Sequence, residues 1–440
     1  MKTLHTDIAV LGAGTAGLAA YRAAKAAGKR ALLIEGGPYG TTCARVGCMP
    51  SKLLIAAAEA AHNAAHTEPF GVHVQGEIAV DGVAVMDRVK RERDRFVGFV
   101  LEGVENIPAE DKIRGYARFV SDTVLRVDEH TEIHASRVVI ATGSRPAVPP
   151  PFRGLGDRLV LNDDVFACDD LPRRVAVFGP GVIGLELGQA LARLGVEVRV
   201  FGVSGSLGGI SDPQVRHSAR KIFQREFYLD PDARVLETQR VGDEVEVRYV
   251  ALDNSERTER FDYALVATGR RPNVDGLGLE NTSLQLNAQG VPLFDRDTMQ
   301  AGDSAIFIAG DANADAPLLH EAADEGRIAG ENAARYPRSA PGLAPRAAGG
   351  GVLGPADRAG GAGPWPPDPG HVRHGRGGFQ RPGPFAGDAE EPRPAACVCG
   401  YRDRSLPGRG NGGPQRRAHR PSAGLGLSLI HISEPTRRYA

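Results

Sequence analysis

Short runs of apolar residues alternate with helix-length segments along the first 340 residues of the chain. The apolar run 8–11 precedes an alanine-rich segment that continues to about residue 27, and the run 31–34 follows it. The same order returns with the run 175–178, a helical segment to about residue 194, and the run 198–201. Short buried strands separated by helices are typical of βαβ units with a parallel sheet. The pattern therefore predicts two α/β units.

The loop after the first strand of each unit carries glycine at its first, third and sixth positions. These residues are Gly12, Gly14 and Gly17 in the first unit, and Gly179, Gly181 and Gly184 in the second. Such a loop turns tightly, lets its backbone approach a pyrophosphate, and packs its helix against the strand. The helix amino terminus adds free N–H groups and a partial positive charge. Both units are therefore predicted to bind dinucleotides.

The second strand of the first unit ends in Glu35, which is placed to accept hydrogen bonds from a ribose. The second unit ends its second strand with Gly202-Val203-Ser204-Gly205, which has neither an acid nor an arginine. An acid there favours NAD and an arginine favours NADP. This position therefore lacks the acidic side chain that would exclude the 2′-phosphate of NADP. The nearby Arg199 could pair with such a phosphate but is expected to face solvent.

Three further apolar segments extend the pattern, and a proline cluster at 146–151 indicates a linker. The segments are 138–143, 264–269 and 306–311. We expect two Rossmann-like three-layer α/β domains, one inserted in the other. Their predicted bounds are 1–145 and 270–335 for the first and 146–269 for the second, followed by an irregular or disordered tail at 336–440.

Two of the five cysteines, Cys43 and Cys48, lie close together just after the first nucleotide-binding unit. Such a close pair in an intracellular protein indicates redox or metal chemistry. A metal site needs further ligands, and no second pair lies nearby, so we expect no metal. A predicted helix start and Lys52 would favour a thiolate. The alternative is two unpaired core cysteines, and Cys168 is expected to be a small buried hydrophobe.

Residues 40–52, Gly-Thr-Thr-Cys-Ala-Arg-Val-Gly-Cys-Met-Pro-Ser-Lys, resemble the redox signature of the class I pyridine nucleotide–disulfide oxidoreductases. The Pro-Ser-Lys ending is closest to the dihydrolipoyl dehydrogenase form. Thr41 departs from the usual glycine, and Ala44-Arg45 from the usual Leu-Asn. The resemblance implies an FAD-dependent enzyme that moves electrons between NAD(P)H, flavin and a Cys43–Cys48 disulfide. A glutathione- or mercuric-reductase type is the enzymatic alternative.

The resemblance also implies roles for individual residues. Cys48 would be the sulfur next to the flavin and Cys43 the thiol that exchanges with substrate. Lys52 would lie near the flavin and pair with Glu186, although both could instead be exposed helix charges. The remaining residues that the resemblance assigns to cofactor binding are Thr42, Gly115, Thr142, Gly143, Gly269, Asp311 and His320. The dihydrolipoyl dehydrogenase-like signature favours NAD over NADP.

The last 100 residues do not follow the family pattern. Residues 341–440 contain 21 Gly, 15 Pro, 14 Arg and 13 Ala, no Lys, and only 13 Leu, Ile, Val and Phe together. This apolar content is below what a packed core requires. The segment is either a basic, disordered extension that binds a polyanion or an out-of-frame translation of a GC-rich gene, which we favour. The family's dimer-interface domain and its His-x4-Glu acid–base element are not recognisable there.

The sequence also limits the expected binding partners and the cellular compartment of the protein. The chain has no stretch of about 18 apolar residues and no convincing signal-peptide cleavage site, so we expect a cytoplasmic protein without a membrane partner. The resemblance implies a disulfide or dithiol substrate and a homodimer. A nucleic-acid partner is not expected. Without its acid–base element the chain could instead be a flavin diaphorase, or a flavoprotein remnant with a binding tail.

Overall fold

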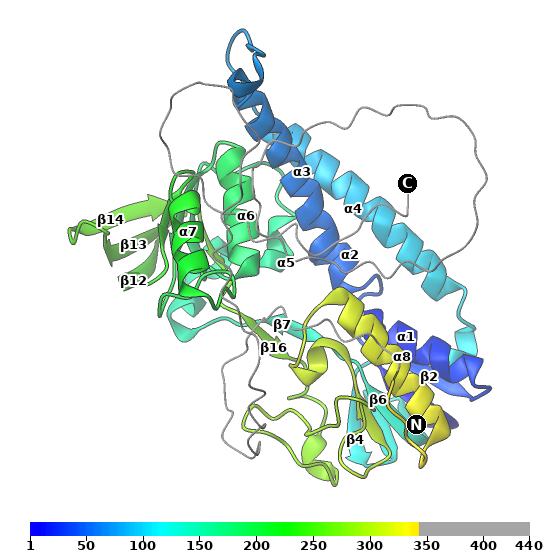
Figure 1. Ribbon diagram of the computed structural model, residues 1–440. Coiled ribbons are helices and arrows are strands. Elements are labelled where there is room, and N and C mark those ends of the chain that lie inside the picture. The colour runs from blue at the N-terminus through cyan, green and yellow to red at the C-terminus, as the bar shows by residue number, and fades with distance from the viewer. Residues whose placement is uncertain (343–440) are drawn as a thin grey trace, which may run out of the picture. The chain divides into compact units, whose positions relative to one another are not determined.

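The computed structural model describes residues 1–342 of the chain (Figure 1). Most of the predicted tail at 336–440 lies outside the described residues, and so do Cys397 and Cys399. The described part of that segment, 336–342, packs on the first sheet's domain. Tyr336 stacks edge-on against Phe307 with ring centroids 6.4 Å apart, and its carbonyl accepts a hydrogen bond from Arg137 at 3.1 Å.

A seven-stranded sheet in the order β3-β2-β1-β6-β5-β4, with β17 beside the second half of β6, organises the first nucleotide-binding unit. Strands β3, β2, β1, β6 and β17 run parallel to one another, whereas β5 pairs antiparallel with β6 and β4 antiparallel with β5. The strands are β1 (Lys2–Leu11), β2 (Ala31–Glu35), β3 (Lys112–Arg114), β4 (Ala117–Ser121), β5 (Val124–Val127), β6 (Thr131–Ile140) and β17 (Ile306–Ile308).

Alternation along the central strand β1 divides the core between the two faces of this sheet. Ile8 and Val10 face a core shared with helices α1 (Thr15–Ala26) and α8 (Leu319–Arg335). Ala9 and Leu11 face a second core that includes Phe119. The two helices lie against each other (Figure 1). Each successive side chain of a strand points to the opposite face, so one apolar run supplies both cores.

The second unit contains a five-stranded parallel sheet in the order β11-β10-β9-β15-β8. Helix α6 (Val182–Arg193) contacts this sheet, and a three-stranded antiparallel sheet shares an apolar core with it. The strands of the parallel sheet are β8 (Leu159–Val160), β9 (Arg174–Phe178), β10 (Glu197–Phe201), β11 (Tyr228–Asp230) and β15 (Tyr263–Val266). Those of the antiparallel sheet are β12 (Arg234–Val241), β13 (Glu244–Val250) and β14 (Glu256–Phe261).

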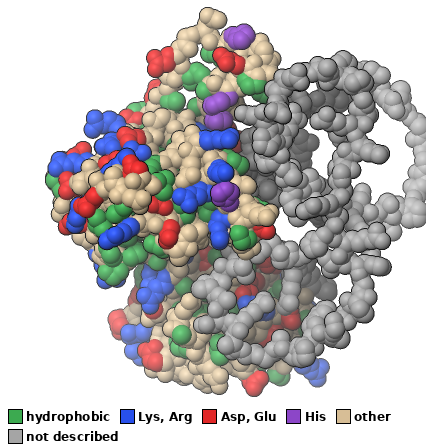
Figure 2. Space-filling model, turned by 60° about the vertical axis from the view of Figure 1, so that its left-hand side comes forward, with side chains coloured by type: hydrophobic (Ala, Val, Ile, Leu, Met, Phe, Trp, Pro, Cys, Tyr) green, Lys and Arg blue, Asp and Glu red, His purple; other side chains and the backbone are tan. Residues whose placement is uncertain are grey.

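Ion pairs join neighbouring strands on the solvent-facing side of the antiparallel sheet. Arg248 contacts both Glu237 and Glu256, and Arg260 contacts Glu246. Basic and acidic side chains accordingly intermingle on this part of the surface (Figure 2). Exposed pairs of this kind contribute little to stability. The mixture gives this face no single sign of charge.

Two short strands and the remaining helices complete the described fold. Strands β7 (Ser144–Pro146) and β16 (Arg270–Pro272) pair antiparallel where the chain leaves and re-enters the first sheet's domain. Helix α3 contacts both α4 and α6 (Figure 1). The helices are α2 (Thr42–Val46), α3 (Cys48–Ala65), α4 (Gly82–Glu105), α5 (Asn162–Val165) and α7 (Pro213–Phe223), with 3-10 turns η1 (Glu68–Phe70), η2 (Ala109–Asp111), η3 (Pro150–Arg158), η4 (Leu279–Asn281) and η5 (Gly310–Asn313).

The predicted fold class, two Rossmann-like three-layer α/β units, is confirmed. Most predicted elements agree with the structure to within a few residues, but the β12–β14 sheet was not predicted and two strands begin earlier than expected. Strand β6 begins at Thr131, whereas the predicted strand begins at residue 138. Strand β1 begins at Lys2 instead of Ile8, because residues 2–6 pair with β6 while alternate side chains face solvent. A search for continuous apolar runs misses a strand whose outer half is polar on one face.

Candidate functional site

The glycine loop of the first unit has the geometry of an anion cradle. The Gly12 amide donates to the Ile34 carbonyl at 2.8 Å, and a side chain at Gly12 would place its Cβ only 2.3 Å from the Ala141 carbonyl oxygen. Gly12 also has φ +105°, which favours glycine. The N-cap of α1 is Gly14, which makes no side-chain cap. The first-turn N–H groups of α1 are therefore left for a ligand, and the cradle fits a pyrophosphate.

Glu35 lies at the edge of this cradle. Its two carboxylate oxygens accept hydrogen bonds from the Ala13 and Gly37 amides, each at 2.7 Å. The Gly115 amide donates to the Glu35 carbonyl at 3.1 Å, which places Gly115 at the same end of the site. The arrangement holds a carboxylate beside the glycine loop, where a ribose hydroxyl would meet it.

The two thiols flank the junction of α2 and α3. Cys43 lies in α2, which begins at Thr42, and Cys48 is the first residue of the 18-residue helix α3. Both cysteines are free; Cys43 is half-buried and Cys48 exposed. A hydrogen bond from the Cys43 thiol, helped by the charge of Lys52, lowers the pKa of Cys48 to about 7. The same hydrogen bond and burial raise the pKa of Cys43.

Thr41, the departure from the usual glycine, precedes this pair and has φ +59°. A threonine in this region of backbone space costs about 1–3 kcal/mol. Its hydroxyl accepts a hydrogen bond from the Ala44 amide at 3.2 Å and so caps α2. An N-cap of this kind contributes about 1 kcal/mol, which offsets part of the strain.

Lys52 and Glu186 form an ion pair that joins α3 to α6. The Lys52 Nζ donates to the Glu186 Oε1 at 2.6 Å, and Glu186 is only 8% exposed. Lys52 lies one turn after Cys48 on α3, so the pair holds a positive charge beside the thiols. The alternative that both are exposed helix charges is wrong for Glu186.

Asp311, which the family resemblance assigns to cofactor binding, lies just after strand β17. The Ser144 hydroxyl donates to the Asp311 carboxylate at 2.7 Å and accepts from the Arg270 Nε at 2.8 Å. Ser144 and Arg270 begin β7 and β16, so the pairing of these strands positions the aspartate. Sequence reasoning did not identify Ser144 or Arg270, because each lies far from Asp311 along the chain.

Glu325 is a second group that the sequence did not mark as functional. It is 6% exposed in the middle of α8, and its Oε2 accepts from the Gly310 amide at 2.7 Å and from Asn313 at 2.8 Å. Burial raises the pKa of Glu325 to about 7. The carboxyl therefore orders the turn that carries Asp311. The family resemblance extends to Glu325 and Gly326 but assigns them no role, and a single glutamate in a helix ordinarily indicates a solvated face.

The other predicted residues are distributed around these clusters. Thr142 exchanges two hydrogen bonds with Asn273, at 2.7 and 3.0 Å. Gly143 and Gly269, at the ends of the two closing strands, have φ +69° and +108°. His320 is the second residue of α8, and its side chain is 58% exposed. These residues do not contact the thiol pair through any hydrogen bond that the structure describes. The second glycine loop, Gly179 to Gly184, repeats the first.

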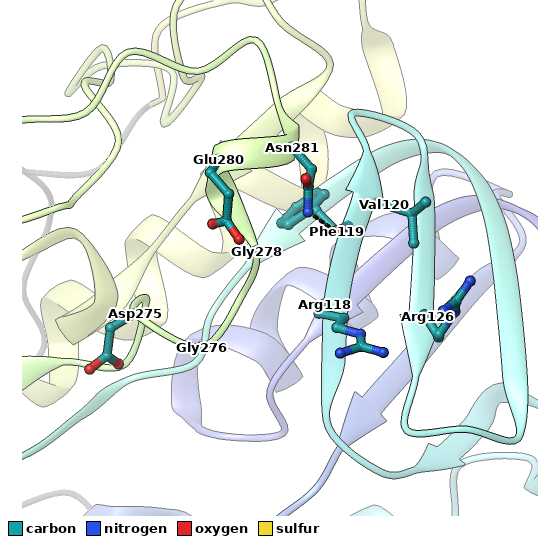
Figure 3. A pocket seen from close by; sticks show the side chains of 9 residues that line it. All are labelled: Arg118, Phe119, Val120, Arg126, Asp275, Gly276, Gly278, Glu280 and Asn281. Atoms are coloured by element: carbon teal, nitrogen blue, oxygen red, sulfur yellow. Dashed lines mark hydrogen bonds between the residues drawn. The ribbon is translucent and has the colours of Figure 1, made fainter.

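A separate pocket of about 420 Å³ lies between the β4–β5 hairpin and the segment 275–281 (Figure 3). Its charged lining consists of Arg118, Arg126, Asp275 and Glu280, two of each sign, and it contains none of the predicted site residues.

Within residues 1–342, no group of three or more His, Cys, Asp or Glu side chains could hold a metal ion, and no helix is long and apolar enough to cross a membrane. Cys168 is half-buried, which raises its pKa.

Comparison with known proteins identifies the family. The profile of the pyridine nucleotide-disulphide oxidoreductases matches residues 6–326. Dihydrolipoyl dehydrogenase of Chlamydia trachomatis is 31% identical over 340 residues, which are 75% of this chain and 70% of that protein. The enzyme of Staphylococcus aureus is 32% identical over 336 residues, with coverages of 74% and 70%.

A solved structure shares the fold. The HOCl-induced flavoprotein disulfide reductase RclA of Escherichia coli is 24% identical, with a TM-score of 0.61 and coverages of 73% of this chain and 69% of that one. The glycine cradles and the thiol pair lie inside the matched segment. The chain belongs to the pyridine nucleotide–disulphide oxidoreductase family and is an FAD-dependent oxidoreductase that uses NAD(P).

Proposed function

We propose that the chain transfers electrons between NAD(P)H and a small or protein-bound disulfide or dithiol substrate through Cys43 and Cys48, as a dihydrolipoyl dehydrogenase-like enzyme. The observation that carries this proposal is the thiol pair itself. Cys48 begins a long helix, accepts a hydrogen bond from Cys43, and lies one turn from a cation that is held by Glu186.

Two units, built from three segments of the chain, would hold the two cofactors. Residues 1–145 and 270–335 would bind FAD through the first glycine loop, Glu35 and Asp311, because the cradle and both carboxylates lie in this unit. Residues 146–269 would bind the nicotinamide nucleotide through the second loop. Bound FAD would supply the relay that accepts a hydride from the nicotinamide and passes an electron pair on.

The protein's own groups account for the thiol chemistry. Reduction of a Cys43–Cys48 disulfide takes two electrons and one proton to give the Cys43 thiol and the Cys48 thiolate, and a second proton converts the thiolate to a thiol. Lys52 stabilises negative charge on the Cys48 sulfur, and Glu186 fixes the position of Lys52. Cys43, whose pKa is raised, keeps its proton and donates a hydrogen bond to the Cys48 sulfur. It must lose that proton before it can exchange with a substrate disulfide.

A diaphorase is the second candidate, because residues 341–440 show no His-x4-Glu element that would remove the Cys43 proton. His320 and Glu325 have the same spacing, but His320 is an exposed residue at the start of α8 with no described hydrogen bond to Cys43. General-base help of this kind contributes about 10²–10⁴-fold in rate. In a diaphorase, a dye or oxygen would take the electrons instead of a disulfide.

The reversible dithiol chemistry fits a reducing compartment such as the cytoplasm. The homodimer that the family resemblance implies can be tested by sedimentation of the full chain.

The test is an anaerobic titration of the FAD-loaded full chain with NADH and with NADPH, followed by thiol counting with Ellman's reagent. We expect reduction to expose two additional thiols per chain, and no gain in Cys43→Ser or Cys48→Ser. Turnover with lipoamide or glutathione disulfide that is lost in both variants supports the disulfide enzyme. Dye reduction that both variants retain, without disulfide turnover, supports the diaphorase. No thiol gain on reduction would overturn the role of the pair.

A further inference from the structure

The two glycine loops can be compared residue by residue, because each makes the same hydrogen bond to its second strand. The Gly12 amide donates to the Ile34 carbonyl, and the Gly179 amide donates to the Phe201 carbonyl, both at 2.8 Å. The residue after Ile34 is Glu35, so the structural equivalent of Glu35 in the second unit is Gly202. This is the position where a carboxylate binds the ribose 2′-hydroxyl of NAD.

The second unit cannot hold a carboxylate at this position. A Cβ at Gly202 would lie 2.5 Å from the Pro180 ring and 2.6 Å from the Pro231 carbonyl oxygen. Both distances are shorter than real Cβ contacts, and the carbonyl is backbone. The space that the Glu35 side chain occupies in the first unit is therefore filled in the second.

The group that holds the carboxylate is lost as well. In the first unit the Ala13 amide donates to Glu35 at 2.7 Å. The equivalent residue in the second loop is Pro180, which has no N–H to donate. The proline in place of an alanine thus removes the N–H donor and fills the space of a side chain at position 202. The glycine at that position is consistent with both effects.

The side chains at the ends of β10 and β11 do not replace the missing acid. Val203 follows Gly202 and is 75% exposed. Asp230 ends the adjacent strand β11, but it is 8% exposed and accepts a hydrogen bond from the Asp232 amide at 3.2 Å. Arg199, a basic candidate in the sequence, is held by Glu259 at 3.0 Å. The exposed charges nearest this position are one of each sign, because Asp232 and Arg234 flank Ala233, whose amide donates to the Gly202 carbonyl at 2.9 Å. The surroundings of a ribose 2′-substituent are therefore neither predominantly acidic nor predominantly basic.

We propose that the nicotinamide site binds NAD and NADP with similar affinity, and that Pro180, Gly202 and Val203 determine this lack of discrimination. The inference rests on the proposed function, because it takes residues 146–269 to be the nicotinamide site. It differs from the prediction made from the redox signature, which favours NAD over NADP. A site that neither repels nor pairs with a 2′-phosphate leaves the shared ADP-ribose and nicotinamide contacts to set the affinity.

The test is calorimetric titration of the oxidised, FAD-loaded full chain with NAD⁺ and with NADP⁺, which measures binding without turnover. We expect dissociation constants that differ by less than about tenfold. A larger ratio in either direction would overturn the inference while leaving the proposed function in place. Failure of both nucleotides to bind would overturn both.

Variants at the exposed position 203 test the assignment of the site without filling the protein core. Val203→Glu should weaken NADP⁺ binding by about tenfold or more and change NAD⁺ binding by less than about threefold. Val203→Arg should tighten NADP⁺ binding by about tenfold. Leu252→Glu, which also places a glutamate at an exposed apolar position, in the β13–β14 turn where Leu252 is 47% exposed, should alter neither constant. Equal effects of Val203→Glu and Leu252→Glu on the two nucleotides would refute the assignment.

Discussion

Replacing Glu325 by glutamine should change how the stability of the protein depends on pH. The Glu325 carboxyl is buried in α8 and accepts hydrogen bonds from Gly310 and Asn313, yet burial raises its pKa from 4.5 to about 7. The folded protein therefore binds a proton more tightly here than the unfolded chain does. The stability from this group is fully present below about pH 4.5 and is lost as the pH rises through about 7.

The size of the effect follows from the shift. A carboxyl whose pKa rises from 4.5 to about 7 on folding costs up to about 3 kcal/mol once it is ionised in both states. Between about pH 5.5 and about pH 8.5 the loss is on the order of 2 kcal/mol. In Glu325→Gln the amide oxygen can accept the same two hydrogen bonds without a charge. We expect the variant to gain about 2 kcal/mol over the wild type across this range.

The assay is urea unfolding of both proteins at about pH 5.5, 7 and 8.5, because the urea midpoint and slope give the free energy of unfolding directly. Glu331→Gln is the matched control, since it makes the same change on a partly exposed side chain of α8. The control should keep the wild-type pH dependence. If Glu325→Gln and the wild type lose stability in parallel as the pH rises, Glu325 is not protonated in the folded protein and our argument is refuted.

Three further perturbations test the rest of the site. In the reduced protein, iodoacetamide should alkylate Cys48 with an apparent pKa of about 7, and Cys43 only at higher pH, as peptide mass mapping would show; equal pH profiles would contradict the assigned hydrogen bond. Lys52→Met should raise the pKa of Cys48 in the same assay and, by leaving Glu186 buried and unpaired, lower the free energy of unfolding by about 1–2 kcal/mol; an unchanged profile would remove Lys52 from the thiol site. Gly12→Ala should abolish FAD retention on gel filtration, because its Cβ would lie 2.3 Å from a backbone oxygen at a positive φ; normal flavin content would refute the cradle.

Much of the fold and part of the site could be predicted because the signals are local. The first glycine loop and Glu35 lie within one βαβ unit, where the turn, the helix start and the strand end constrain one another over about 30 residues. Cys43 and Cys48 are likewise close in the chain. The outer half of β1 was missed because its residues alternate with polar ones, and the β12–β14 sheet was not predicted.

Other contacts join residues that are distant in sequence. Lys52 and Glu186 are 134 residues apart, and Ser144 and Asp311 are 167 apart. The family resemblance suggested the first pair, but only the packing of α3 on α6 shows its geometry. Nothing local to Ser144 indicates that it lies beside Asp311, because that contact depends on the chain returning through β16.

The sequence by itself determined two dinucleotide-binding units and a thiol pair at a helix start, because short-range backbone geometry restricts which residues can occupy those turns. The tertiary structure decided which charges meet and which are buried. It removed Glu325 from solvent, and it placed the Pro180 ring where a carboxylate at position 202 would lie. Burial and exclusion of this kind depend on what packs against a residue, which its neighbours in the chain do not specify.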